Sequence, residues 1–160
     1  MALCLATSLI EQGCFDALDQ MERYVQWQEH GYLSSNGQCF DIGNTVANAL
    51  NNFKQTRNPM SGSTASHTAG NGCLMRLAPV PMFYYPDVQG AIERCAESSM
   101  NTHAAEECIQ ASKLFGGILF IALYGADNDA ILLKHNVSGF TADSINAIAQ
   151  GQYRSKTESQ

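Results

Sequence analysis

The stretch FDIGNT places a carboxylate and an amide three residues apart around a glycine, at Asp41 and Asn44. A carboxylate can orient or deprotonate a ribose hydroxyl or a water molecule, and an amide can both donate and accept hydrogen bonds. The pair therefore suits chemistry on a single sugar, with Asp41 as the catalytic group. The structural alternative is that Asp41 closes an Asx turn and Asn44 or Thr45 caps the next helix. The spacing alone leaves both interpretations open.

A second candidate is the glycine-rich stretch Gly70, Asn71, Gly72, which leads into a short predicted helix. Free backbone N–H groups and the positive end of a helix dipole attract anions, and glycine lets the backbone approach a phosphate closely. The long polar loop before it favours function, because long structureless connections are uncommon in compact domains. The alternative is an ordinary loop-to-helix junction with Arg76 as a surface or packing residue, since short glycine patterns are weak signals.

Histidines and the remaining carboxylates supply fewer candidates. His103 is predicted to open the longest helix, where an imidazole either caps the helix or reaches a ligand above it. Asp127 and Asp129 lack a third ligand and the spacing of a calcium loop, so a turn with a helix cap explains them better. No spacing typical of zinc ligands joins the other histidines, which are His30, His67 and His135. The sequence therefore predicts no metal ligand.

Helices must position these candidates, because apolar residues recur at helical spacing and strand-like alternation is scarce. We expect an all-α fold in a single domain over residues 1–160, with a polar tail at 151–160. Asp16 is expected to cap the second helix, and Gly13 and Gly31 suit the ends of the first two helices. Pro79 and Pro81 are expected to stop the short helix after Gly72. Thr141 is expected to cap the last helix. The other predicted helices cover residues 2–12, 16–28, 46–53, 87–100, 103–124, 127–135 and 141–150.

Composition describes a globular chain and excludes several classes of function. With 160 residues, 45% hydrophobic and 15% charged, the chain is long enough to bury a core and is unlike a disordered segment. A net charge of −6 with nine scattered Lys and Arg argues against a nucleic-acid partner. The six cysteines form no C-x-x-C pair and are expected to be reduced. No apolar run reaches the length of a membrane span, about 18 residues, so we expect a cytoplasmic protein without a membrane partner.

Taken in order, these stretches resemble the ADP-ribosylglycohydrolase family, which removes ADP-ribose from modified proteins and includes the dinitrogenase reductase-activating glycohydrolases. The landmarks are MALCLATSLIEQG, then CFDIGNTVANAL, then GNGCLMRLAPV, then SSMNTH before the long apolar helix. The resemblance implies an orthogonal helical bundle whose cleft holds two magnesium ions. It also implies that Asp41 is the carboxylate at the substrate ribose, Asn44 an amide beside it, Gly70 to Gly72 the loop around the phosphates, and His103 a residue of the cleft.

The chain departs from the family at the metal ligands. In the family, a Thr-Asp-Asp stretch precedes the first helix and an aspartate cluster ending in threonine lies far downstream, and neither occurs here. We therefore expect this chain to correspond to a middle portion of the family domain, with magnesium implied by the family but its ligands absent. Since the ions would activate the attacking water, hydrolysis by this chain alone should be weak or absent. Two alternatives remain, a non-catalytic binder of ADP-ribose or a nucleotide, and a helical remnant that acts as an interaction module.

Overall fold

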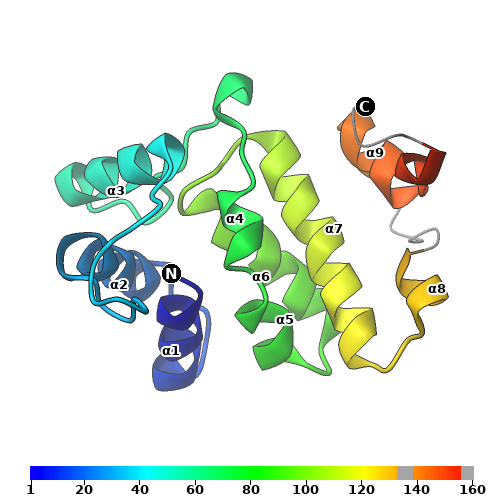
Figure 1. Cartoon of the computed structure of the whole chain (residues 1–160), viewed down its shortest axis with the longest axis horizontal. Helices are drawn as coiled ribbons and strands as arrows, with labels where there is room; N and C mark the ends of the chain where they lie inside the picture. Colours follow the sequence, from blue (N-terminus) through cyan, green and yellow to red (C-terminus); the bar gives the residue numbers. More distant parts are fainter. Residues whose placement is uncertain (133–138, 156–160) are drawn as a thin grey trace.

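The computed structural model describes residues 1–132 and 139–155. These residues form helices and no strand, which confirms the predicted all-α class; an isolated bridge joins Ser63 and His103. Figure 1 shows their order along the chain. The helices are α1 (Ala2–Gln12), α2 (Ala17–His30), α3 (Asn44–Thr56), α4 (Gly72–Met75), α5 (Pro79–Tyr84), α6 (Val88–Met100), α7 (Glu106–Leu123), α8 (Asn128–Leu132) and α9 (Asp143–Ala149), with 3-10 turns at Ser66–Thr68 and Gln152–Ser155.

The start of α2 and the ends of α1 and α2 lie where local chemistry predicts. The Asp16 side chain accepts a hydrogen bond from the backbone N–H of Asp19, 3.0 Å away, and so caps α2. Gly13 and Gly31 end α1 and α2 in the left-handed conformation, with φ of 68° and 65°. Gly31 is required for a second reason, because a β-carbon there would overlap the backbone carbonyl of Gly37. The loop that leads to Asp41 is thereby anchored at its start.

Two predicted helix boundaries are wrong. Pro79 begins α5 instead of stopping a helix, because a proline in the first turn lacks only an N–H that would have no partner there. The N-cap of α9 is Ala142, without a side-chain cap, while the Thr141 hydroxyl accepts a hydrogen bond from the Gln110 amide on α7. Thr141 therefore ties two helices together instead of capping one.

The segment after α7 is partly described. Asp127 caps α8 by accepting from the backbone N–H of Ala130 at 2.7 Å, as the turn interpretation predicts. Residues 133–138, which include His135, and residues 156–160 of the expected polar tail lie outside the described residues. The described start of that tail forms the 3-10 turn at Gln152–Ser155.

The main core lies where α1, α2 and α3 meet α5 and α6, and α6 packs along α7 (Figure 1). Burial of its side chains supplies most of the stabilisation, at roughly 1.5–3 kcal/mol for each large apolar side chain. Four of the six free cysteines are also buried, in line with small structural hydrophobes. The largest fully buried apolar side chains are Leu5, Leu9, Met21, Tyr24, Leu50, Phe53, Leu77 and Val80.

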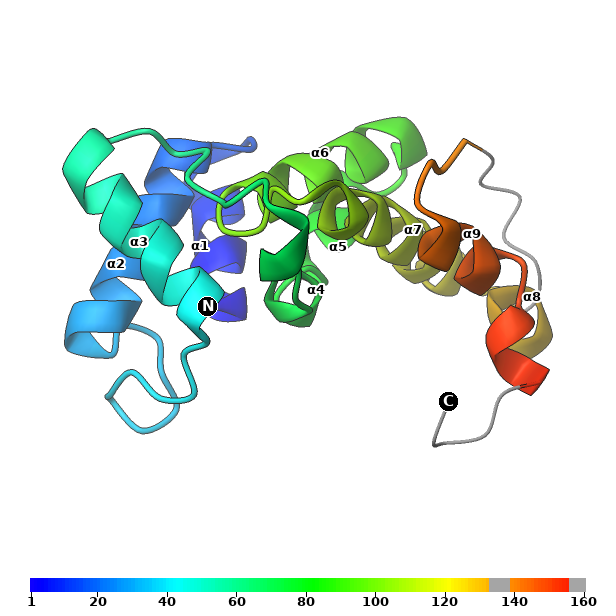
Figure 2. The ribbon, with the colours of Figure 1, turned by 90° about the horizontal axis from the view of Figure 1, so that it is seen from above.

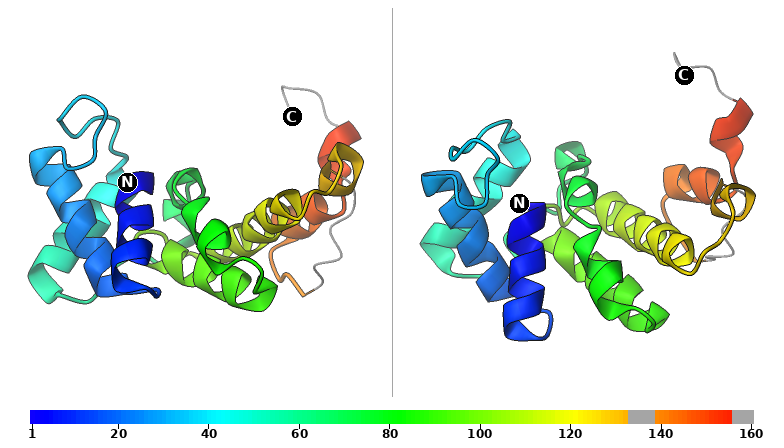
Figure 3. Two further views of the ribbon diagram at one scale, coloured as in Figure 1. Left: turned by 90° about the horizontal axis from the view of Figure 1, so that it is seen from below. Right: turned by 60° about the horizontal axis from the view of Figure 1, so that its bottom comes forward.

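The far end of α7 is partly exposed, although the helix is strongly apolar in sequence. Its N-terminal half packs between other helices, but Leu123 is 45% exposed and the adjoining Tyr124 is 72% exposed. Figures 2 and 3 show α8 and α9 away from α1 to α3. The helix α8 follows the far end of α7, whereas α9 packs through Ile145 and Ala149 on Leu114, nearer the middle of α7. None of the helices in residues 1–132 and 139–155 combines the length and the apolar character needed to cross a bilayer.

Replacing either of two adjacent glycines of α7 with alanine should change the stability of the protein in opposite directions. A β-carbon at Gly116 would lie 2.5 Å from the Cys95 sulfur, whereas one at Gly117 would meet only Ile92 at an ordinary 4.0 Å. Gly116→Ala should therefore lower the free energy of unfolding by about 1 to 2 kcal/mol through overpacking. Gly117→Ala should leave it unchanged or raise it by up to about 1 kcal/mol, because alanine favours helix. Urea denaturation of both variants checks this, and equal effects would contradict the close packing of α6 on α7.

Candidate functional site

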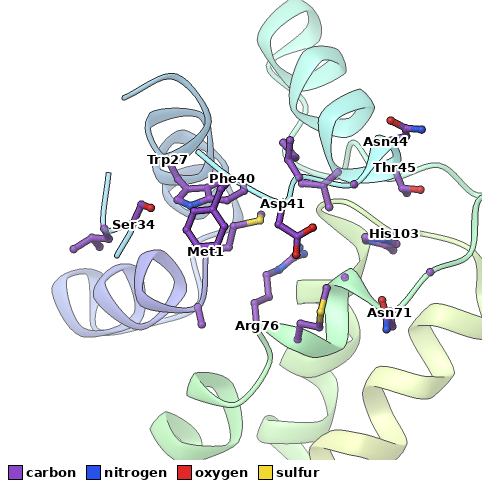
Figure 4. A pocket seen from close by; sticks show the side chains of 18 of the residues that line it. Met1, Trp27, Ser34, Phe40, Asp41, Asn44, Thr45, Asn71, Arg76 and His103 are labelled. Carbon is purple, nitrogen blue, oxygen red and sulfur yellow. The ribbon is translucent and has the colours of Figure 1, made fainter. Parts of the chain in front are cut away.

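A pocket of about 540 Å³ lies between the start of α3, the start of α4 and the loop that follows α2 (Figure 4). We call it the main pocket, and its volume is within the range of small-molecule sites. All six predicted site residues line it, although they come from segments far apart in the chain. They are Asp41, Asn44, Gly70, Asn71, Gly72 and His103.

Asp41 lies in the loop just before α3, with a left-handed φ of 53°. Within the described residues its carboxylate makes no hydrogen bond, so the Asx turn of the structural alternative is not formed. Figure 4 shows this carboxylate on the side of the pocket that Arg76 also borders. Asp41 is therefore an exposed carboxylate available to a ligand.

Asn44 does not cap α3, contrary to the structural alternative. The N-cap is Gly43, with an extended φ of −74° and ψ of 153°, and Asn44 is the first helical residue. The Thr45 hydroxyl does not cap α3 either, because it donates to the backbone carbonyl of Thr68 at 3.2 Å. In Figure 4 the Asn44 and Thr45 side chains extend away from the Asp41 carboxylate. The two polar groups of the FDIGNT stretch therefore border the same pocket but point in different directions.

The glycine-rich stretch makes room for an imidazole. A β-carbon on Gly72 would lie 3.0 Å from His103 Cε1 and 3.3 Å from Nε2, which is tighter than most real contacts. The backbone N–H of Gly70 is already directed at the Cys108 sulfur, 3.5 Å away. The helix that follows has only four residues, so its dipole adds little to anion binding. Any phosphate contact here must depend on individual N–H groups.

Arg76 is a buried packing residue, 2% exposed, and not a surface residue. Its Nη2 donates to the backbone carbonyl of Ser98 at 2.8 Å, and its guanidinium lies over the Tyr24 ring, 5.0 Å from the centroid. Nε and Nη1 have no hydrogen-bond partner in the described part of the chain. Arg76 nevertheless borders the main pocket, so a positive charge lies beneath its wall.

His103 precedes the long helix instead of opening it. The helix α7 begins at Glu106, because Ala105 has the extended backbone of an N-cap, with φ of −61° and ψ of 137°. His103 is 3% exposed, and its Nδ1 lies 2.9 Å from the Thr102 hydroxyl. Burial, assisted by the positive charge of Arg76, lowers the pKa of the imidazole from its usual 6.5 to about 4. His103 is therefore neutral at pH 7.

This shift makes stability depend on pH. Between about pH 6.5 and pH 4 the unfolded chain binds a proton at His103 that the folded chain does not, so the free energy of unfolding falls as the pH falls through this window. The loss should reach at most about 3 kcal/mol. Urea denaturation at pH 7 and pH 4.5 measures it, and His103→Gln should show a smaller decrease than the wild type. Equal decreases in the two proteins would contradict the neutral, buried imidazole.

The sequence did not indicate the aromatic side of the pocket. Trp27 from the end of α2 and Phe40 from the following loop border it beside Met1, as Figure 4 shows. Trp27 is 7% exposed and Phe40 is 50% exposed. The residues of this side share no motif, and only the fold of α1 and α2 brings them together. An apolar side facing polar groups is typical of sites for small molecules.

Comparison with known proteins identifies the family. The profile of the ADP-ribosylglycohydrolase family matches residues 1–158. The chain belongs to the ADP-ribosylglycohydrolase family. The resemblance of the sequence landmarks to this family is thereby confirmed.

Similar proteins include two that are named ADP-ribosylarginine hydrolase Tri1. The protein from Pseudomonas putida (strain GB-1) is 36% identical over 160 residues, which cover 100% of this chain and 43% of that protein. The protein from Serratia proteamaculans (strain 568) is 38% identical over 135 residues, which cover 84% of this chain and 37% of that protein. This ADP-ribosylglycohydrolase chain thus spans about two fifths of the length of those relatives.

A solved structure supports the fold. It is titled ADP-ribosylglycohydrolase-related protein complex and is 37% identical, with a TM-score of 0.65 over 82% of this chain and 41% of the other. The helical arrangement described above is therefore that of an ADP-ribosylglycohydrolase.

Magnesium, which the family resemblance implies, does not fit the residues that this ADP-ribosylglycohydrolase chain presents. Among the residues that line the main pocket, Asp41 is the single carboxylate. Across residues 1–132 and 139–155 there is no group of three or more His, Cys, Asp or Glu side chains placed to hold a metal ion. A magnesium ion is usually held by one or two carboxylates, with water and substrate phosphates as its other oxygen ligands, so the two ions that the resemblance implies need more carboxylates than Asp41. The described residues therefore do not form a magnesium site by themselves.

Proposed function

We propose that the main pocket binds the ADP-ribose moiety of an ADP-ribosylated protein, so that this chain supplies substrate-binding residues of an ADP-ribosyl hydrolase. The observation that supports this most is the gathering of the six site residues, from distant segments, around one pocket of about 540 Å³. The substrate class comes from the family and from the relatives named ADP-ribosylarginine hydrolase. An arginine-linked ADP-ribose is therefore the proposed substrate. The cytoplasm, which the sequence analysis led us to expect, is the proposed location.

Each residue has a proposed role that follows from its surroundings. The Asp41 carboxylate, exposed and without a hydrogen bond in the described chain, orients a ribose hydroxyl or a water molecule. Asn44 offers its amide at the rim of the pocket. The backbone N–H groups of Asn71 and Gly72 face the diphosphate, Gly70 lets the loop approach it closely, and the neutral His103 imidazole supports this loop from beneath.

Calorimetric titration with ADP-ribose in the presence of EDTA tests the binding step. The wild type should bind, and Asn44→Ala should bind more weakly, because it removes an amide that forms no hydrogen bond within the described residues and so leaves the fold intact. Absence of binding by the folded wild type would reject the proposal.

Hydrolysis by this chain alone should be weak or absent. A positioned general base raises the rate of a reaction about 10²- to 10⁴-fold, whereas a whole enzyme raises it by about 10⁶-fold or more. We expect no more than a trace of ADP-ribose release from an ADP-ribosylarginine peptide, with or without magnesium, measured by chromatography. Rapid release that needs magnesium and is lost in Asp41→Asn would contradict this.

A non-catalytic ADP-ribose binder is the second candidate. It is favoured by the single carboxylate among the residues that line the main pocket. Binding without turnover supports this candidate, and turnover restored by adding a polypeptide that carries the family's aspartate clusters supports the first.

A further inference from the structure

A second pocket, of about 570 Å³, lies on the other side of the start of α3. One wall is the face of α3 that carries Asn44, Asn48 and Asn52, and the other is the loop 61–68 with its hydroxyl side chains. Asn44 and Thr45 line both pockets, so the first turn of α3 is the ridge between them. In Figure 4 the side chains of Asn44 and Thr45 extend away from Asp41.

The wall formed by the loop 61–68 is held in place by the backbone. The N–H of Gly62 donates to the carbonyl of Met100, and the N–H of Ala104 donates to the carbonyl of Ser63, each at 3.0 Å. The Ser61 hydroxyl, 5% exposed, donates to the carbonyl of Asn58 at 2.6 Å. These bonds hold the pocket wall in shape, which lowers the conformational entropy that the protein must lose when a ligand binds.

The chemistry of the second pocket selects a neutral ligand with many hydrogen-bonding groups. Apart from the imidazole of His67, its lining consists of amides, hydroxyls, glycine and alanine, with no carboxylate, ammonium or guanidinium group. The amides of Asn44 and Asn48 make no hydrogen bond within residues 1–132 and 139–155, and Asn52 makes a long one, 3.5 Å, to the carbonyl of Ser61. Each asparagine amide offers a donor and an acceptor, as a peptide group does.

The spacing of the three asparagine amides fits an extended peptide better than a sugar. Residues four apart on a helix are displaced by about 6 Å along its axis, so the three amides span about 12 Å. Alternate residues of an extended chain repeat at about 6.6 Å, which matches this ladder, and a single pentose is too short to span it. The match extends over Asn44, Asn48 and Asn52, which follow one another at four-residue spacing on one face of α3.

From this geometry, and resting on the proposed function of the main pocket, we infer that the second pocket binds the extended backbone of the target protein next to its ADP-ribosylated arginine. The ADP-ribose lies in the main pocket, and the chain beside the modified residue crosses the ridge at Asn44 and Thr45 into the asparagine-lined pocket.

The test uses a nonapeptide of glycine and serine with a central arginine, in ADP-ribosylated form, and free ADP-ribose. Asn48→Leu should weaken binding of the modified peptide about tenfold, because two hydrogen bonds are lost, and should change ADP-ribose binding less than twofold. Asn51→Leu is the matched control, since Asn51 is exposed on the same helix but lines neither pocket, and both affinities should stay within twofold of the wild type. Peptide affinity of Asn48→Leu within twofold of the wild type overturns the inference. Equal losses for peptide and ADP-ribose also overturn it, because the second pocket would then hold part of ADP-ribose.

The unmodified peptide separates this inference from the proposed function. In NMR titrations of the wild type it should shift the side-chain amide signals of Asn48 and Asn52, even if ADP-ribose does not bind. Absence of these shifts at millimolar peptide overturns the peptide site, whatever the main pocket does. Failure of ADP-ribose to bind, together with these shifts, rejects the function of the main pocket and leaves the peptide site supported.

Discussion

Replacing Gly72 with valine is expected to weaken ADP-ribose binding by more than about 100-fold. A β-carbon at this position already approaches His103 Cε1 at 3.0 Å, and the methyl groups of valine must displace either the imidazole or the loop 70–72. Both form the proposed wall for the diphosphate, and lost contacts to a charged group cost about 1.5 to 3 kcal/mol each. Calorimetric titration of ADP-ribose against the variant and the wild type measures the change.

The control for this variant is Ala69→Val, which adds the same side-chain shape to an exposed neighbour that lines neither pocket. Its affinity should stay within threefold of the wild type. Thermal melts show whether Gly72→Val is folded. If it is not folded, the affinity of Asn44→Ala for ADP-ribose tests the proposed binding site instead. A folded Gly72→Val that binds ADP-ribose within threefold of the wild type would show that the glycine-rich loop does not contact the ligand.

Replacing Gly62 with alanine is expected to lower the free energy of unfolding by about 3 kcal/mol. The added β-carbon would lie 2.6 Å from the backbone nitrogen of His103 and 2.7 Å from the carbonyl oxygen of Met100. These are backbone atoms and cannot rotate away, so the loop must separate from residues 100–104 and give up the two hydrogen bonds that join them. Urea denaturation of Gly62→Ala and of the wild type measures the difference in the free energy of unfolding.

Gly70→Ala is the matched control for Gly62→Ala, because its β-carbon would meet the His103 side chain at an ordinary 3.5 Å. Its stability should lie within about 0.5 kcal/mol of the wild type. Gly62→Ala should also weaken ADP-ribose binding, since His103 follows the backbone that moves. A Gly62→Ala variant as stable as Gly70→Ala would be incompatible with the tight junction between the loop 61–68 and His103.

Local signals predicted the parts of the fold that local chemistry determines. The aspartate cap at Asp16 and the left-handed glycines Gly13 and Gly31 place the ends of α1 and α2 without help from tertiary structure. The prediction that Pro79 stops a helix was wrong because proline is compatible with two positions, the residue after a helix and the first turn of a new one. His103 was misplaced because the extended backbone at Ala105 depends on the loop 61–68, which lies far away in the sequence.

The candidate site was predicted in its polar residues but not in its surroundings. Asp41, Asn44 and the glycine-rich stretch carry motifs, whereas Trp27 and Phe40 reach the pocket only because α1 and α2 fold beside it. The asparagine face of α3 carries a signal that was available, since Asn44, Asn48 and Asn52 repeat every four residues. That pattern indicates a binding site only together with the loop 61–68, which forms the opposite wall of the pocket.

The buried guanidinium of Arg76 has a consequence for how the main pocket responds to ionic strength. Charges on a protein surface are screened by dissolved ions over about 10 Å at 0.1 M salt, whereas buried charges are screened much less. Arg76 has a backbone carbonyl and an aromatic face as its neighbours and forms no salt bridge within the described residues, so its charge is not ion-paired. Anions should therefore remain attracted to this pocket in concentrated salt that releases them from exposed lysines.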